Sequence, residues 1–166
     1  VMAFLTETNS IPVAEPVVAP NLVVFTPAHA ALVTGWVRSD GELFRLSPRT
    51  APPFTTDKLL EWHVADGYAF LYQRGPERPC GYLELNPMKS CENQWWIGHC
   101  LVAPEHRNEG IGRHMVQQAL DHAFLNLSAQ QVCLVVFPSN HNAVQCYQKV
   151  GFRFQQEVYR EFETRP

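Results

Sequence analysis

The sequence has little that would bind a metal ion or cross-link the chain. Its five cysteines are odd in number and show no CxxC spacing, which argues against a zinc ribbon and against a fully paired disulfide framework. The seven histidines form neither an HExxH motif nor a cluster with the cysteines. We therefore expect no structural and no catalytic metal.

Positive charge and long apolar runs are also scarce. A net charge of −3 provides no basic field for nucleic acid. No apolar run approaches the roughly 18 residues needed to cross a bilayer, and the first residues lack the basic and apolar regions of a secretory signal. The sequence predicts a cytoplasmic protein with no nucleic-acid and no membrane partner.

Residues 21–166 are expected to form a single domain, which is the simplest reading of a chain of 166 residues. Residues 1–20 contain three prolines and show no helical period. Such a segment is typical of extended chain. We expect it to form an arm that packs on the domain or on a neighbouring copy.

Within the domain, alternating segments predict strands and periodic segments predict helices. Expected strands cover 21–27, 67–74, 80–87, 94–102, 131–137 and 152–162, and expected helices begin at Thr26–Pro27, Ser39, Thr55, Gly110 and Ser139. Gly151 is expected to end the last helix. The order of elements predicts an α+β fold, in which helices pack on a mixed sheet.

Gly110 and Gly112 stand between an expected strand and an amphipathic helix. Unpaired backbone N–H groups at such a helix start form an anion site. A dinucleotide fingerprint would need a third glycine where Met115 stands and a carboxylate at the end of the next strand, where residues 138–140 have none. The GxxxxGK[ST] loop of triphosphate-binding proteins is absent from the sequence. Taken alone, the two glycines fit a simple tight turn equally well.

Two linked motifs give the glycines a more specific meaning. R-x-x-G-x-G, beginning at Arg107, resembles the acetyl-CoA-binding motif of the GCN5-related N-acetyltransferases. The segment from Asn140 to Tyr147, followed by QKVGF, resembles the N-x-x-A-x-x-x-Y-x-x-x-G-F segment of the same family. VAPEHRNEGIG is similar to the family's V-D-P-x-x-R-x-x-G-I-G, with Ala103 in place of the acidic residue. The resemblance is close over about residues 80–155.

The resemblance implies a mixed, mostly antiparallel central sheet of six to seven strands with a splayed parallel pair, flanked by about four helices. It also implies acetyl-CoA as co-substrate, with its pyrophosphate bound by backbone N–H groups of the glycine loop. The loop residues are Arg107, Asn108, Glu109, Gly110, Ile111, Gly112 and Arg113. The side chain of Arg107 either adds charge to the loop or braces it.

The pantetheine arm is expected to pair with the backbone of Leu101 and Val102, where one N–H can stabilise the developing oxyanion. Asn140 is expected to cap the second helix, which we favour, and a contact with the pantetheine is the additional role that the resemblance allows. By resemblance, Tyr147 protonates the departing thiolate; a half-buried core tyrosine is the alternative.

The acceptor amine is protonated near neutral pH, so its attack requires a base or a water relay. Family members that use a carboxylate on the central strand have it near Trp95 and Trp96 of this sequence, which cannot act as bases. The alternatives are Glu84 on the preceding strand, His99 on the same strand and Glu92 in the loop between them. We favour Glu84.

Other residues near the expected site have two interpretations. Cys100 and Cys146 suggest an acyl-cysteine route, but small buried cysteines are common as packing residues. Four aromatic residues either line an acceptor pocket or belong to the core: Trp36, Phe44, Trp62 and Trp96.

The resemblance predicts an enzyme that moves an acetyl group from acetyl-CoA to a primary amine, on a small molecule or a peptide N-terminus, by direct attack in a ternary complex. The alternative is a non-catalytic acyl-CoA-binding or regulatory module on the same fold. Residues 152–166 leave room for one good strand where the family usually ends in two. Because an unpaired edge invites another strand, we expect a homodimer or coverage by the arm of residues 1–20.

Overall fold

The computed structural model describes residues 2–8 and 19–159. In chain order, the strands are β1 (Met2–Thr8), β2 (Leu22–Val24), β3 (Tyr68–Tyr72), β4 (Gly81–Pro87), β5 (Gln94–Val102), β6 (Gln131–Val136) and β7 (Arg153–Val158). The α-helices are α1 (Ala30–Thr34), α2 (Asp40–Leu46), α3 (Thr56–Leu60), α4 (Ile111–Asp121) and α5 (His141–Val150). Short 3-10 turns at Pro27–His29 and Pro104–His106 precede α1 and α4, and a π-helical turn at His122–Asn126 extends α4.

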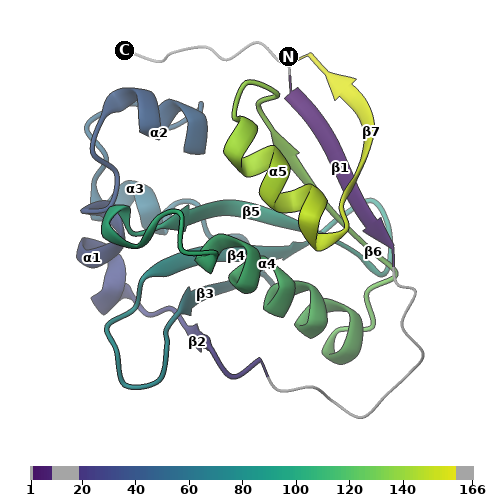
Figure 1. Cartoon of the computed structure of the whole chain (residues 1–166), viewed down its shortest axis with the longest axis horizontal. Coiled ribbons are helices and arrows are strands. Elements are labelled where there is room, and N and C mark those ends of the chain that lie inside the picture. Colours follow the sequence, from purple (N-terminus) through teal and green to yellow (C-terminus); the bar gives the residue numbers. More distant parts are fainter. Residues whose placement is uncertain (1, 9–18, 160–166) are drawn as a thin grey trace.

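The seven strands form one mixed sheet in the order β2-β3-β4-β5-β6-β1-β7 (Figure 1). Every neighbouring pair is antiparallel except β5 and β6, which are parallel. The expected mixed, mostly antiparallel sheet is therefore confirmed. The five α-helices of the described residues are one more than the resemblance implied.

Pairing between the two parallel strands is short. It runs from Gln94–Gln131 to Trp96–Cys133, and the rest of β5 pairs with β4 alone. The expected splayed pair is thus β5 and β6. Figure 1 shows α4 and α5 together on one side of the sheet, and α1, α2 and α3 gathered at one end of it.

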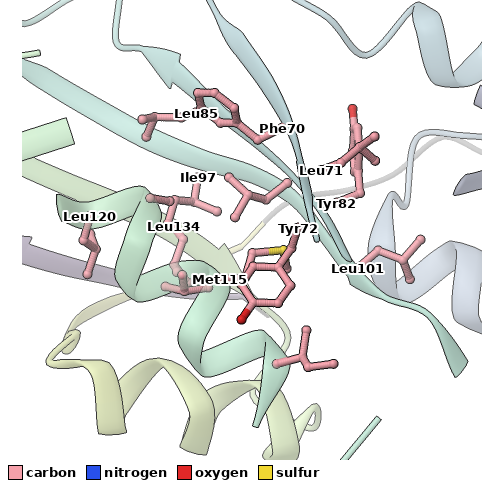
Figure 2. Close-up of a cluster of buried hydrophobic side chains, with 14 of the residues drawn as sticks. Phe70, Leu71, Tyr72, Tyr82, Leu85, Ile97, Leu101, Met115, Leu120 and Leu134 are labelled. Atoms are coloured by element: carbon pink, nitrogen blue, oxygen red, sulfur yellow. The ribbon is translucent and has the colours of Figure 1, made fainter. Parts of the chain in front are cut away.

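Alternate residues of β4 face opposite sides of the sheet. Gly81 lies against Met115 of α4, so Leu83 shares the side that packs on α4. Figure 2 shows Met115 among the buried side chains of this core. Tyr82 and Glu84 face the other side, which we call the α3 face; the segments that follow α2 and α3 contact it.

Local sequence signals explain where the first helices begin. The Ser39 hydroxyl caps α2 by accepting from the backbone N–H of Glu42 (3.2 Å). Only half of the expected capping box forms, because the Glu42 carboxylate accepts from the N–H of Arg38 instead (3.0 Å). Thr26 and Pro27 open a 3-10 turn that continues into α1.

The N-terminal segment contributes an interior strand. Within the expected arm of residues 1–20, β1 lies between β6 and β7 and pairs antiparallel with both. Leu5, opposite Leu134 and Phe154, is 1% exposed. Residues 9–18 of the arm lie outside the described residues. Strand β7 obtains its partner from this segment, while its other side is the sheet edge.

The sequence does not mark β1 as a strand. Buried residues on both of its faces remove the alternation that identifies a half-exposed strand. The prolines that follow it in the sequence favour extended backbone but do not specify which strand it pairs with. Its position in the sheet depends on pairing with strands more than 120 residues away, which no local pattern specifies.

Leu5→Ala is expected to lower the free energy of unfolding by about 2–5 kcal/mol, because it leaves a cavity between β6 and β7. Urea denaturation checks this value. Thr8→Ala, at the exposed end of the same strand, is the control and should change stability by about 0.5 kcal/mol or less. Equal effects of the two substitutions would show that β1 does not pack in the core.

Candidate active site

The glycine loop forms the start of α4. Gly110 is the N-cap residue with φ 79°, a left-handed conformation that favours glycine. The first helical hydrogen bond runs from His114 N–H to the Gly110 carbonyl (3.1 Å). The N–H groups of residues 111–113 thus precede the helical ladder, and the positive end of the helix dipole lies behind them. This arrangement suits a phosphate group.

Arg107 braces this loop. Its Nε donates to the Val102 carbonyl (3.1 Å), and its two terminal nitrogens donate to the Glu42 carboxylate (3.0 Å) and the Trp36 carbonyl (3.3 Å). The backbone N–H of Arg38 and, next, the Arg107 guanidinium lower the pKa of Glu42. Of the two roles expected for the Arg107 side chain, the structure shows the bracing one.

The remaining loop side chains point to several environments. Glu109 forms an ion pair with Arg74 (3.5 Å), Ile111 belongs to the core, and Asn108 and Arg113 are exposed. A Cβ on Gly112 would lie 3.6 Å from the side chain of Val102 and 3.7 Å from that of Cys146. These are ordinary van der Waals distances, so glycine leaves about a methyl group's space between α4, β5 and α5.

Leu101 and Val102 lie where β5 has left β6. On the other side they pair with Tyr82 and Gly81 of β4. The apolar side chain of Leu101 is buried in the core. An extended chain with amide groups can pair with β5 at such an opening, as an added strand does.

Tyr147 projects from α5 and is half-buried. Its ring packs edge-on against Phe152 at a centroid distance of 6.0 Å. Its hydroxyl is hydrogen-bonded to the Cys100 thiol, and burial, followed by the neighbouring Cys100 and Cys146, raises the pKa of Tyr147 well above its usual value. The phenol is thus protonated at neutral pH and already meets a sulfur atom.

Both cysteines beside Tyr147 are protonated as well. Burial, then Cys146, raises the pKa of the Cys100 thiol to about 12, with the Tyr147 hydrogen bond acting in the opposite direction. Burial also raises the pKa of Cys146. Because the thiolate is the nucleophilic form, these environments disfavour an acyl-cysteine route.

Asn140 occupies the N-cap position of α5, but its side chain makes no capping hydrogen bond. The expected capping bond is therefore wrong, although the position is right. Asn140 has a ψ of 69°, and its backbone N–H donates to the carbonyl of Phe137 (2.9 Å). The segment between β6 and α5 thus makes a turn that ends at Asn140.

A β-bulge in β5 brings Glu84 and His99 together. Leu83 is opposite Cys100 and Leu85 is opposite Ile97, so the two residues between them on β5 oppose Glu84 alone. The Glu84 side chain is 1% exposed, and its Oε2 lies 2.7 Å from His99 Nδ1.

Gly98 makes this close approach possible. A Cβ at Gly98 would lie 3.2 Å from the Cβ of Glu84, from Nδ2 of Asn86 and from the ring of Trp96. A larger residue would push these neighbours apart and disturb the Glu84–His99 pair.

One tautomer of His99 satisfies the chain of hydrogen bonds around its ring. Trp62 Nε1 donates to Thr50 Oγ1 (2.8 Å), so the Thr50 proton can go to Ser47 Oγ (2.8 Å). The Ser47 proton then goes to His99 Nε2 (3.2 Å), which leaves the ring proton on Nδ1, facing Glu84. A neutral imidazole with an accepting Nε2 has the form of a general base.

Two further side chains complete the network. The Trp62 ring stacks on that of His99 at 3.7 Å. The Tyr82 hydroxyl, whose pKa is raised by burial and then by the neighbouring Glu84, donates to Glu84 Oε2 (3.0 Å) and contacts His63 Nε2 (3.1 Å). Sequence reasoning missed Ser47, Thr50 and Tyr82, because nothing in their spacing points to His99.

The other candidate residues lie elsewhere. Glu92 is exposed in the turn between β4 and β5 and makes none of these hydrogen bonds. Trp36 is buried in the core, whereas Trp96 borders Gly98 of the bulge. Phe44 of α2 stacks on Phe137 at 5.5 Å.

The described residues contain no group of three side chains that could ligate a metal ion. In the same part of the chain, every helix is too short or too polar to cross a lipid bilayer.

These features define a class of α+β protein: a mixed sheet that opens between one parallel pair, with an anion-binding helix start and a tyrosine at the opening. The sequence profile of the acetyltransferase (GNAT) family matches residues 35–152. The chain belongs to this family.

Curated relatives match parts of the chain. Spermidine N(1)-acetyltransferase of Vibrio cholerae is 34% identical over 112 residues, which are 64% of this chain and 62% of that protein. N-acetyltransferase family 8 member 3 of Rattus norvegicus is 38% identical over 88 residues, 51% of this chain and 38% of that protein. The chain thus spans less than two thirds of the length of these relatives.

Solved structures share the fold. A crystal structure of spermidine N-acetyltransferase from Vibrio cholerae, in complex with CoA and spermine, has a TM-score of 0.71 at 21% identity, over 86% of this chain and 85% of that one. An acetyltransferase of the GNAT family from Novosphingobium aromaticivorans has a TM-score of 0.60 at 18% identity, over 93% of this chain and 61% of that one.

The partly buried Cys100 thiol should make stability depend on alkaline pH. Its pKa is raised from 9.0 to about 12, so the unfolded chain loses the proton at lower pH than the folded one. The contribution of the protonated Cys100 thiol to the free energy of unfolding is therefore complete below pH 9. It is lost as the pH rises towards 12.

Urea denaturation at pH values across this range should show a shallower loss of stability for Cys100→Ala than for the wild type. Cys91 is exposed, and Cys91→Ala is the matched control that should follow the wild type. A Cys100→Ala slope equal to that of the wild type would contradict the burial of this thiol.

Proposed function

We propose that this chain is an acetyl-CoA-dependent N-acetyltransferase that transfers an acetyl group to a primary amine by direct attack in a ternary complex. The observation that carries the proposal is the position of the protonated Tyr147 hydroxyl, on a sulfur atom beside the opening between β5 and β6. A proton donor is needed there when a thiolate departs.

The residues at the opening fit a coenzyme A thioester. Gly112 leaves space between α4, β5 and α5. Of the expected loop residues 107–113, the N–H groups of 108–113 would hold the pyrophosphate, because the Arg107 N–H donates to the Pro104 carbonyl (3.4 Å). The backbone of Leu101 and Val102 would pair with the pantetheine arm, and Asn140 would border it. When bound, acetyl-CoA supplies the activated acetyl group.

Glu84 and His99 would act together as the base. The carboxylate of Glu84 fixes the Nδ1–H tautomer of His99, so Nε2 can accept a proton from the acceptor amine directly or through the Ser47 hydroxyl. The Glu84 carboxylate then stabilises the imidazolium. Tyr147 would act from the other side of β5 as the acid.

For the acceptor, we propose a polyamine of the spermidine and spermine type ahead of other small amines and peptide N-termini. The support is that the relatives from Vibrio cholerae and Escherichia coli are named spermidine N(1)-acetyltransferases. A homodimer and a cytoplasmic location stay predictions, as does a single domain over residues 21–166.

A non-catalytic acyl-CoA-binding module is the second candidate. It is favoured by Trp95 and Trp96, which stand where family members that use a carboxylate on this strand have it. The two functions differ in whether an added amine causes bound acetyl-CoA to lose its acetyl group.

Purified protein with acetyl-CoA is expected to release free thiol in proportion to added spermidine, because transfer of the acetyl group frees coenzyme A. A thiol-reactive dye measures this release, and protein without amine is the control. Saturable acetyl-CoA binding without amine-dependent thiol release, over a panel of polyamines, simple amines and peptides, would favour the non-catalytic module.

Tyr147→Phe is expected to lower kcat by about 10²–10⁴-fold, the usual contribution of a positioned general acid. The Kd for coenzyme A should stay near that of the wild type, because the phenyl ring and its contact with Phe152 remain. Steady-state kinetics and calorimetry separate the two quantities. Equal kcat values for Tyr147→Phe and wild type would show that Tyr147 is a packing residue.

A further inference from the structure

The glycine loop carries an acidic side chain at a place that suits a bound anion. Glu109 immediately precedes Gly110, the N-cap residue of α4. The N–H groups of residues 111–113 lie at the positive end of the helix dipole, which favours a carboxylate as well as a phosphate. A free Glu109 side chain would therefore compete for these N–H groups and would also repel a pyrophosphate.

Two side chains hold the Glu109 carboxylate instead. Its Oε2 lies 3.5 Å from Nη1 of Arg74 and 3.4 Å from Nδ1 of His106. A further contact joins Nη2 of Arg74 to the same nitrogen of His106, at 3.4 Å. The carboxylate is thus turned towards Arg74 rather than towards the start of α4, and the Arg74 guanidinium balances its charge.

The turn between β3 and β4 fixes Arg74 in this position. The Glu77 backbone N–H donates to the Arg74 carbonyl (3.0 Å), and the Glu77 carboxylate lies 3.2 Å from Arg74 Nε. Two residues before Arg74, the Tyr72 hydroxyl is hydrogen-bonded to His114 on the first turn of α4. The end of β3 is therefore joined to the start of α4 as well as to Glu109.

We propose that Arg74 is a positioning residue for coenzyme A, which keeps the Glu109 carboxylate off the pyrophosphate site. The inference rests on the proposed function, because it takes the glycine loop as that site. Arg107 braces the loop from β5 and α2, and Arg74 holds it from the β3–β4 turn. Arg74 acts through Glu109, so the effect of removing Arg74 depends on the Glu109 charge.

A double-mutant cycle with coenzyme A as the ligand tests this dependence. Arg74→Gln should raise the Kd for coenzyme A by about 3–10-fold, because the released carboxylate competes with the pyrophosphate and repels it. Glu109→Gln should bind coenzyme A at least as tightly as the wild type. The double variant should bind within about twofold of Glu109→Gln alone, because no carboxylate is left to release. Calorimetry measures all four proteins.

Arg78→Gln is the matched control for the loss of one positive charge. Arg78 lies in the same turn, is exposed, and forms no ion pair with any residue that the structure describes. Its substitution should change the Kd by about twofold or less. The effect of Arg74→Gln should also shrink as the salt concentration rises from about 50 to about 500 mM, because salt screens charges. Thermal melts confirm that each variant is folded.

The inference is overturned if Arg74→Gln binds coenzyme A as the wild type does. It is also overturned if Arg74→Gln weakens binding equally with and without the Glu109 carboxylate, since Arg74 would then act on the ligand or the loop directly. A wild type that does not bind coenzyme A would overturn the proposed function and the inference with it. The expected cycle without amine-dependent thiol release would support the inference and favour the non-catalytic module.

Discussion

The separation of β5 from β6 is the constraint on which the rest of the site depends. The two strands pair only as far as Trp96–Cys133, so the following half of β5 has one backbone edge without a strand partner from β6. The start of α4, braced to β5 by Arg107, lies at this edge, and α5 presents Tyr147 to the Cys100 side chain there. Had the pairing continued, a ligand could not have reached the backbone of β5.

The β-bulge lies immediately after this separation and determines which side chains meet. It places two residues of β5 opposite Glu84, so that His99 turns to the α3 face while Cys100 turns towards α5. One face of the strand thus has a histidine held by the Glu84 carboxyl group, and the other has a protonated phenol. An acid and a base on opposite faces of one strand are suited to a reaction that takes a proton from one partner and gives a proton to the other.

The two oxygens of the Glu84 carboxyl group have different environments. Oε2 contacts His99 and accepts from Tyr82, whereas Oε1 is buried without a hydrogen-bond partner among the described residues. A buried carboxylate is costly unless its oxygens are paired, so the second oxygen requires a donor of its own.

The sequence alone determined the elements with local signals: the glycine loop at Gly110, the boundaries of β5, and the segment from Asn140 to Tyr147 that begins α5. These follow from backbone preferences and periodicity over a few residues. It also pointed to Glu84 and His99, but not to their contact. Only the tertiary structure decided that Met2–Thr8 lies inside the sheet, that Arg107 braces the loop, and that Ser47 meets His99 52 residues away. Such contacts depend on strand register and bulges, which arise from packing across the whole sheet rather than from neighbouring residues.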